Sequence, residues 1–262
     1  MNIGFIGLGE MGTHIAANLV KNNFKISVYN RTLIKAKKFS KKFKCVYESS
    51  IESLCKNKNI IILCLTTDSV VESIIDQIIK YINPGSIIID HSTINYQVSN
   101  RIYNKAKKRK VNFLDAPITG GPIGAEQGKL GIMIGGDNSA FQKTKKIMQS
   151  YSKTLEYIGA SGQGQLAKIS NQIVSFNIKQ GLLEGLDFAN RYNIKRKKLV
   201  RVLLSGSAHS YQLTKHLKSI LKKTYEKKRH YSIKEIGIAI KNAKNKKLRL
   251  PCTEQIAKII KT

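Results

Sequence analysis

The chain has 262 residues and carries 46 Lys and Arg against 16 Asp and Glu, which gives a formal net charge of +30. Its hydrophobic share of 42% and its four prolines are ordinary for a globular protein of one large or two medium domains. The longest apolar run, residues 60–65, is too short to cross a membrane, and no signal peptide is evident. We therefore expect a cytoplasmic protein without a membrane partner.

The cysteines and the basic residues argue against two other classes of protein. None of Cys45, Cys55, Cys64 and Cys252 forms a C-x-x-C pair, and no His lies at ligand spacing from them, so we expect no metal site. The Lys and Arg residues are spread along the chain in short runs instead of one concentrated patch. This distribution favours a biased composition over a nucleic-acid-binding surface.

The first half of the chain alternates short apolar runs with amphipathic segments. Such alternation predicts a doubly wound α/β sheet, in which continuous apolar runs form interior parallel strands. A helix is expected over residues 11–22, directly after the first strand. The expected strands cover residues 2–7, 25–30, 60–65, 86–90, 111–117, 130–136 and 154–159.

The second half has a different pattern, with no strong strand signal after residue 159. Residues 164–192 contain no proline and read as one long helix. Further helices are expected at 195–205, 208–222, 232–246 and 251–261. We place the domain boundary near 160, giving a Rossmann domain over 1–160 and an all-helical substrate and oligomerisation domain over 161–262, joined by the long helix.

A G-x-G-x-x-G motif at Gly7, Gly9 and Gly12 follows the first predicted strand and opens the first predicted helix. In that context the first glycine allows the tight turn, the second lets a pyrophosphate approach the backbone, and the third lets helix and strand pack closely. The free N–H groups of the helix then bind phosphate. The alternative, a glycine-rich turn that binds nothing, fits this context less well.

The residues after the second predicted strand indicate which dinucleotide binds. NAD sites commonly carry Asp or Glu there to hold the ribose 2′-hydroxyl, whereas this chain has Asn30, Arg31 and Thr32. A carboxylate would repel a 2′-phosphate, and an arginine pairs with it. The sequence therefore predicts NADP in preference to NAD.

Two further features point to a substrate site beside the cofactor. The glycine-rich stretch 115–136 follows a strand, and its backbone N–H groups, with the Thr119 hydroxyl, are suited to hold a carboxylate. On the long helix, one polar stripe contains Lys168, Asn171, Gln172, Ser175 and Lys179. A solvated face is the default interpretation of any lysine in so basic a chain. Amides one turn away from Lys168 favour a cleft, because they orient a hydroxyl or carbonyl.

Four stretches together resemble the β-hydroxyacid dehydrogenase family, which includes 3-hydroxyisobutyrate dehydrogenase, tartronate semialdehyde reductase, and glyoxylate and succinic semialdehyde reductases. They are "GFIGLGEMG", "DAPITGGPIGAEQGKLGIMIGG", "GQGQLAKISNQ", and "GSAHSYQL" with "IKEIGIAI", and they run from residue 4 to about residue 240. The resemblance implies a hydride transfer between NADP(H) and a short β-hydroxy acid or aldehyde acid, and a homo-oligomer, a dimer or a tetramer.

The resemblance also implies roles for individual residues. Lys168 would be the catalytic acid–base group with Asn171 beside it, and the implied substrate-binding residues are Thr119, where the family usually has serine, Gly120, Gly121 and Gln172. Thr93 would face the nicotinamide, and Lys234 would lie near the cofactor. The full set of predicted cofactor-binding residues is Gly7, Leu8, Gly9, Glu10, Met11, Gly12, Asn30, Arg31, Thr32, Leu65, Thr66, Thr93 and Lys234.

The chain departs from the family pattern near its end. It lacks Pro-Gly-Phe before "IKEIGIAI", and it stops before family members usually end, so we expect a shortened helical domain. Two alternatives to a β-hydroxyacid dehydrogenase stay open. One is a glyoxylate, succinic semialdehyde or imine reductase on the same scaffold, and the other is a basic nucleic-acid-binding protein on a retired dehydrogenase scaffold.

Overall fold

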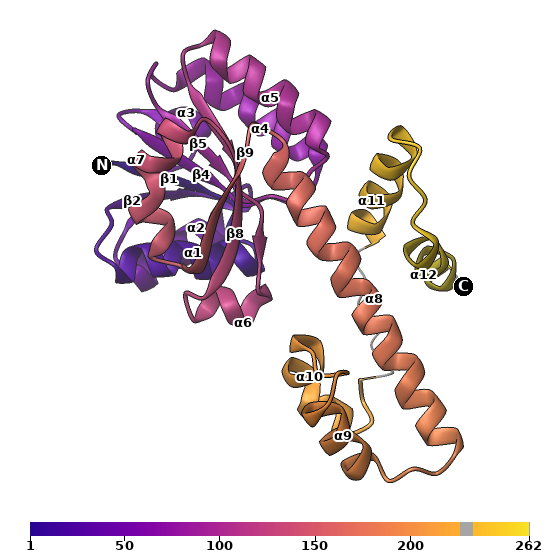
Figure 1. Cartoon of the computed structure of the whole chain (residues 1–262). Helices are drawn as coiled ribbons and strands as arrows, with labels where there is room; N and C mark the ends of the chain where they lie inside the picture. The colour runs from indigo at the N-terminus through magenta and orange to yellow at the C-terminus, as the bar shows by residue number, and fades with distance from the viewer. Residues whose placement is uncertain (226–232, 262) are drawn as a thin grey trace. The chain divides into compact units, whose positions relative to one another are not determined.

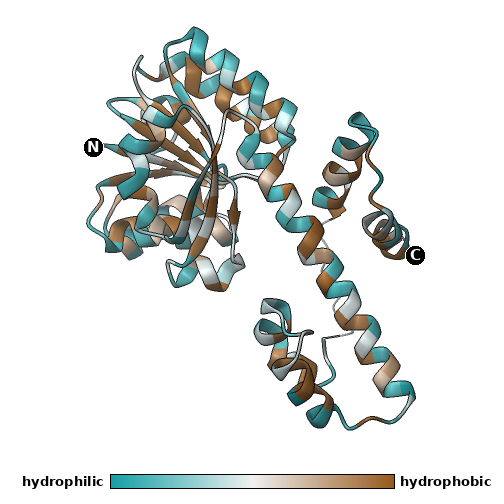
Figure 2. Cartoon of the chain, in the orientation of Figure 1, coloured by the Kyte–Doolittle hydropathy of each residue, from teal (hydrophilic) through white to brown (hydrophobic). Residues whose placement is uncertain are grey.

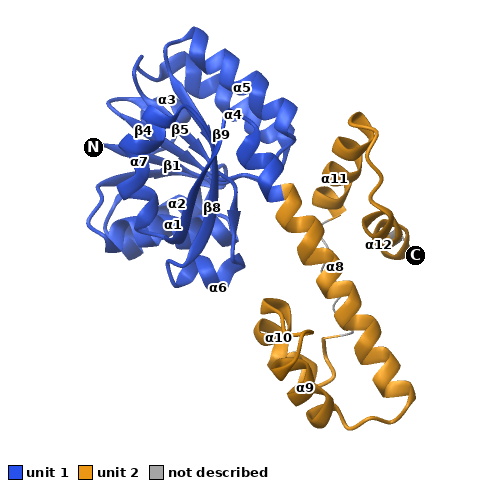
Figure 3. Ribbon diagram, in the orientation of Figure 1, with its two compact units in different colours: residues 1–168 blue, residues 169–262 orange. Residues whose placement is uncertain are grey.

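The computed structural model describes residues 1–225 and 233–261 (Figure 1). The chain divides into two compact units, Met1–Lys168 and Ile169–Thr262 (Figure 3). This division lies inside a helix, later than the boundary expected near 160, because the first turns of that helix are hydrogen-bonded to the sheet of the first unit.

The first unit is built on one sheet with strand order β3-β2-β1-β4-β5-β6-β8-β7, to which β9 is added beside β8. The strands from β3 to β6 are parallel, β8 runs antiparallel to β6 and β7, and β9 is parallel to β8. The bounds are β1 (Ile3–Ile6), β2 (Ile26–Tyr29), β3 (Val46–Tyr47), β4 (Ile60–Leu63), β5 (Ile87–Asp90), β6 (Asn112–Asp115), β7 (Ile118–Thr119), β8 (Leu130–Gly136) and β9 (Ser152–Gly159).

Helices cover both faces of this sheet, and each face has its own apolar core. Successive strand residues point to opposite faces, so Ile60 and Ile62 of β4 join one core while Ile61 and Leu63 join the other. Figure 2 shows the apolar colour concentrated on the strands. The helices of this unit are α1 (Glu10–Lys21), α2 (Leu33–Phe43), α3 (Ile51–Cys55), α4 (Asp68–Tyr81), α5 (Tyr96–Lys108), α6 (Gly121–Glu126) and α7 (Asn138–Gln149).

The second unit is helical throughout its described residues. The long helix α8 (Gln163–Arg191) begins in the first unit and continues into the second, where α9 (Arg196–Ser205), α10 (Tyr211–Leu221), α11 (Ile233–Asn245) and α12 (Pro251–Lys261) follow. The predicted fold class, a Rossmann-type sheet followed by a helical region, is confirmed. Residue 232, the expected start of the fourth helix of this half, lies outside the described residues.

Candidate active site

A cleft of about 550 Å³ lies at the carboxyl ends of β1, β2 and β4. In the strand order, β1 stands between β2 and β4, so the connections lead to opposite sides of β1 and the loops that follow β1 and β4 diverge at this point. Part of the cleft lining was predicted from the sequence as cofactor-binding: Gly7, Gly9, Asn30, Arg31, Thr32, Leu65 and Thr66. The other lining residues, which include Lys35 from the first turn of α2, were not.

The three glycines of the motif are required for different reasons. Gly7 has φ +102°, and a Cβ there would lie 2.3 Å from the Cys64 carbonyl oxygen. A Cβ on Gly12 would lie 1.9 Å from the carbonyl oxygen of Gly7, so only glycine lets α1 approach the turn this closely. A Cβ on Gly9, by contrast, would meet nothing within 4 Å. Gly9 caps the N-terminus of α1, so this open space fits a phosphate group approaching the helix N–H groups.

Asn30 holds the glycine turn instead of pointing freely into the cleft. Its side-chain oxygen accepts a hydrogen bond from the Leu8 N–H at 2.9 Å, and its Nδ2 donates to the Thr32 carbonyl at 3.1 Å. Arg31 and Lys35 are exposed at the cleft, and no Asp or Glu is among its lining residues. The cleft therefore carries two cations where a dinucleotide places its adenosine ribose.

The remaining residues predicted in the glycine motif lie around the cleft without lining it. Leu8 and Gly12 are buried, Met11 is partly buried, and Glu10 is exposed in the first turn of α1. A carboxylate in the first turn is stabilised by the helix dipole, so Glu10 has a structural explanation that involves no cofactor.

The predicted carboxylate-binding loop has the strained backbone expected of its glycines. Thr119 ends β7, and Gly120 and Gly121 follow with φ +117° and +65°. The segment then enters the short helix α6, with Pro122 in its first turn. Thr119 packs closely on β8, because a Cβ on its strand partner Gly131 would lie 2.9 Å from the Thr119 methyl group.

Lys168 is buried, with only 6% of its surface exposed, and it is the one lysine in the buried class among the residues that the structure describes. The start of its helix is fixed by Asp115 at the end of β6. One carboxylate oxygen accepts from the Gly162 N–H at 2.7 Å and the other from the Gln165 N–H at 2.9 Å. Burial raises the pKa of Asp115 to about 6, and these hydrogen bonds oppose that shift.

The segment after β5, which contains Thr93, is fixed by buried polar side chains. His91 lies between the Ala116 carbonyl, 2.6 Å from Nδ1, and the Tyr151 hydroxyl, 2.9 Å from Nε2. A carbonyl only accepts, so Nδ1 carries the proton and Nε2 accepts from Tyr151. Burial lowers the pKa of His91 to about 4, while its hydrogen bond to the Ala116 carbonyl opposes the shift.

Asn171, Gln172 and Lys234, the other predicted site residues, belong to the helical unit. There Asn171 Nδ2 donates to Gln172 Oε1 at 2.9 Å, and Gln172 Nε2 donates in turn to the Glu235 carboxylate. Lys234 precedes Glu235 in the first turn of α11. The two amides are therefore held in one orientation by a carboxylate that the sequence analysis did not single out.

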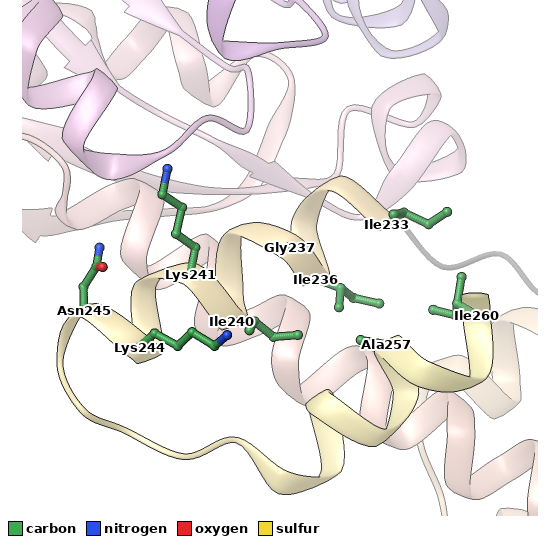
Figure 4. A pocket seen from close by; sticks show the side chains of 9 residues that line it. All are labelled: Ile233, Ile236, Gly237, Ile240, Lys241, Lys244, Asn245, Ala257 and Ile260. Carbon is green, nitrogen blue, oxygen red and sulfur yellow. The ribbon is translucent and has the colours of Figure 1, made fainter. Parts of the chain in front are cut away.

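A second cavity, of about 450 Å³, lies between α11 and α12 (Figure 4). Its floor is apolar, and lysine and asparagine side chains stand at one end. It contains neither a glycine turn nor any of the predicted site residues. The lining residues are Ile233, Ile236, Gly237, Ile240, Lys241, Lys244, Asn245, Ala257 and Ile260.

Two kinds of site are not found in the part of the chain that the structure describes. There, no group of three or more His, Cys, Asp or Glu side chains is arranged to hold a metal ion. Likewise, no helix among residues 1–225 and 233–261 combines the length and the apolar character that a membrane crossing requires.

Two family models together match nearly the whole chain. Residues 2–159 match the NAD binding domain of 6-phosphogluconate dehydrogenase, and residues 162–262 match a domain described as NAD-binding of NADP-dependent 3-hydroxyisobutyrate dehydrogenase. The chain belongs to the β-hydroxyacid dehydrogenase family. It is a nicotinamide-dependent hydroxyacid dehydrogenase, and the resemblance identified in its sequence is confirmed.

Individual relatives of this dehydrogenase span most of its length. An uncharacterized oxidoreductase of Shewanella frigidimarina is 32% identical over 95% of this chain and 87% of its own. The 2-hydroxy-3-oxopropionate reductase of Escherichia coli is 29% identical over 100% of this chain and 91% of its own. The 3-hydroxyisobutyrate dehydrogenase of Mycobacterium tuberculosis has the same fold, with a TM-score of 0.88 at 22% identity, over 98% and 91% of the two chains.

Proposed function

We propose that this dehydrogenase transfers a hydride between NADP(H) and a short β-hydroxy acid or its aldehyde acid, with Lys168 as the acid–base group. The observation that carries the proposal is the burial of Lys168. In a chain with 46 Lys and Arg residues, a lysine at 6% exposure on a helix start clamped by Asp115 differs from the solvated lysines around it. Burying a cation costs free energy, so a functional requirement is the better explanation.

The mechanism assigns separate tasks to the residues of the site. When bound, the nicotinamide supplies or accepts the hydride. In reduction, the Lys168 ammonium stabilises the negative charge that builds on the carbonyl oxygen and then delivers a proton; in oxidation the amine accepts that proton. The N–H groups of Gly120 and Gly121 and the Thr119 hydroxyl bind the substrate carboxylate. Asn171, oriented through Gln172 and Glu235, aligns the reacting oxygen.

The proposed preference for NADP rests on the charge at the ribose end of the cleft. Arg31 and Lys35 line it, no carboxylate does, and Asn30 uses its amide to brace the glycine turn. The description of the family model that matches residues 162–262 also names an NADP-dependent enzyme. A reductase using NADPH would convert an aldehyde acid into a hydroxy acid in the cell.

The experiment that tests the function is a substrate panel with purified protein. Tartronate semialdehyde, methylmalonate semialdehyde, succinic semialdehyde, glyoxylate and a cyclic imine are each assayed for oxidation of NADPH and of NADH. We expect turnover of a β-aldehyde acid with NADPH. Turnover of the imine alone would favour an imine reductase, and turnover of none with either cofactor would contradict the proposal.

The acid–base role is tested by Lys168→Ala beside Lys146→Ala, which removes an exposed lysine from α7. We expect the first substitution to lower kcat by about 10²–10⁴-fold, because proton transfer by a positioned side chain contributes that much. The second should leave kcat unchanged. If the Lys168→Ala variant kept more than about a tenth of the activity, Lys168 would not be the acid–base group.

We also propose that the helical unit associates with a second copy of the chain. Among its described residues, the buried hydrophobic side chains form three small, separate clusters, whereas those of the first unit form two large ones. Large apolar side chains stay exposed on its helices, among them Val174, Phe188 and Val202 at 58%, 63% and 67%. Apolar surface of this kind is typical of an interface.

A further inference from the structure

The side chain of Gln165 joins the start of α8 to the segment that follows β5. It is fully buried, and both of its polar atoms are used. Oε1 accepts a hydrogen bond from the Ile94 N–H at 3.0 Å, and Nε2 donates to the Ser92 carbonyl at 2.8 Å. The two partners stand on either side of Thr93, so one amide fixes the backbone on both sides of that residue.

The same contacts extend to the edge of the cofactor cleft. The Ser92 hydroxyl accepts from the Leu65 N–H at 2.8 Å, and Leu65 lines the cleft beside Thr66. On the other side, the Gln165 N–H donates to Asp115 Oδ2. Gln165 therefore connects the loops after β4 and β5, and the end of β6, to the first turn of α8. Lys168 follows one turn later on the same face of that helix.

We propose that Gln165 is a positioning residue that holds Thr93 and the edge of the cofactor cleft at a fixed distance from Lys168. The inference rests on the proposed function, because it assigns the nicotinamide end of the cofactor to Thr93 and the proton transfer to Lys168. A glutamine suits the task, since its amide accepts from one backbone group and donates to another while carrying no charge into the buried site at any pH. Errors of about 1 Å in such alignment lower rates by about 10²-fold.

The test compares Gln165→Glu with Gln163→Glu, the same chemical change at an exposed position of the same helical turn. The carboxylate at 165 still accepts from Ile94, but it faces the Ser92 carbonyl with no proton to donate. At pH 8 we expect kcat to fall by about 10- to 100-fold, and the Kd for NADPH to change by less than about threefold. The matched change at 163 should alter neither value.

Acidification provides a second readout that a merely structural role would not move. Once protonated, the introduced carboxyl donates to the Ser92 carbonyl again, so the ratio of variant to wild-type kcat should rise toward one as the pH falls from 8 to 6. The titratable groups nearest to this position are Asp115 on β6, which accepts from the residue-165 N–H, and Asp90 at the end of β5, which accepts from the Ser92 N–H; His91 and Lys168 belong to the adjoining segments. They are present in both proteins, so a change in the ratio with pH reports on the introduced carboxyl.

Hydrogen exchange tests the two hydrogen bonds of the Gln165 amide, called the Gln165 clamp below, in an experiment that does not depend on enzyme activity. In the wild-type protein we expect the Ile94 amide to exchange slowly, and in Gln165→Leu its protection should be lost while the global unfolding free energy still supports a folded protein. Fast exchange at Ile94 in the wild type would overturn the clamp itself. If the Ile94 amide exchanged slowly in the wild type but Gln165→Glu left kcat unchanged, the positioning role would be overturned. If the substrate panel shows no turnover, the proposed function fails while the exchange result still stands.

Discussion

At the scale of single residues, the proposed preference for NADP over NAD assigns the 2′-phosphate to Arg31. It is exposed at the cleft, so its guanidinium has no competing carboxylate among the lining residues and is available to a 2′-phosphate. We expect Arg31→Ala to raise the Kd for NADPH by about 10- to 100-fold, because a hydrogen bond to a charged group contributes about 1.5–3 kcal/mol. The Kd for NADH should stay nearly constant.

Lys37→Ala is the matched control for this titration, since Lys37 is exposed on α2 but lies outside the cleft lining. Cofactor fluorescence measures the Kd of NADPH and of NADH for the wild type and for both variants. A similar loss of affinity for both cofactors, or the same loss in the Lys37 variant, would show that general attraction by the basic chain is responsible instead of a specific phosphate contact.

His91 gives the stability of the protein a defined dependence on pH. Its pKa falls from 6.5 to about 4 on folding, so between these values the unfolded chain binds a proton that the folded protein does not. Stability from His91 is therefore present above pH 6.5 and is lost as the pH falls toward 4. Asp115 acts in the opposite direction. Its pKa is raised to about 6, so as the pH falls below 6 the folded protein takes up this proton before the unfolded chain does, and the contribution of Asp115 to stability rises.

The comparison of His91→Gln with the wild type separates these two contributions, since Asp115 is common to both proteins. At pH 7.5 the variant should be less stable, having lost the pairing with Ala116 and Tyr151. By pH 4 that difference should shrink by about 3 kcal/mol, the value of the His91 pKa shift. Urea unfolding at a series of pH values measures it, and a difference independent of pH would contradict the buried, neutral imidazole.

At the scale of elements, two glycines of the turn between β1 and α1 should affect different properties. We expect a substitution at Gly9 to weaken cofactor binding alone, and one at Gly12 to lower stability as well. Gly9→Ala adds a methyl group where no atom lies within 4 Å, so the melting temperature should hardly change. The methyl would occupy the space that we propose for a phosphate, so NADPH binding should weaken. Gly12→Ala places a methyl 1.9 Å from the Gly7 carbonyl oxygen, so it should lower the melting temperature as well.

Calorimetry and cofactor titration of these two variants form one matched pair, because the chemical change is identical and the positions are three residues apart. If Gly9→Ala bound NADPH as tightly as the wild type, the cofactor would not approach the backbone at this turn. If instead both variants lost stability to the same degree, the turn would serve only packing.

Elements with a clear apolar pattern were predictable from the sequence, and elements without one were not. Continuous apolar runs such as residues 60–65 and 86–90 indicated β4 and β5 because both faces of these strands are buried. The strand β3 has only two residues, both exposed, so it has no apolar pattern. The short helix α6 lies within the glycine-rich stretch 115–136, where positive φ at Gly120 precedes it, and glycine suggested a loop.

The candidate site was predictable only where chemistry is concentrated in one stretch of sequence. The glycine motif and the Lys168 stripe are local patterns. Gln165, by contrast, hydrogen-bonds to residues 71 and 73 positions away, and Asp115 bonds to residues 47 and 50 positions away. Nothing in the spacing along the chain indicates such partners, because they meet only when the sheet brings the ends of β5 and β6 to α8.

At the scale of the whole molecule, the surface of the helical unit predicts self-association. Phe188 lies near the end of α8 and Tyr192 directly follows that helix; their rings contact each other in a tilted arrangement with centroids 4.7 Å apart, and both side chains are more than 60% exposed. Aromatic residues exposed together are enriched at interfaces. We expect the wild-type protein to be a dimer or a tetramer, measured by light scattering after gel filtration. Phe188→Glu should shift it to a smaller species, because burying a carboxylate without a partner is costly.

The control is Val46→Glu, which places the same charge on the edge strand β3 of the first unit at a valine that is 57% exposed. It should leave the mass unchanged. Both variants should keep the near-ultraviolet signal of the folded wild type, which separates loss of assembly from loss of structure. A wild-type protein that is monomeric at micromolar concentration would contradict the interface, and the exposed aromatic pair would then need another explanation. If only Phe188→Glu dissociates the assembly, the contact lies on α8, the same helix that carries Lys168 at its other end.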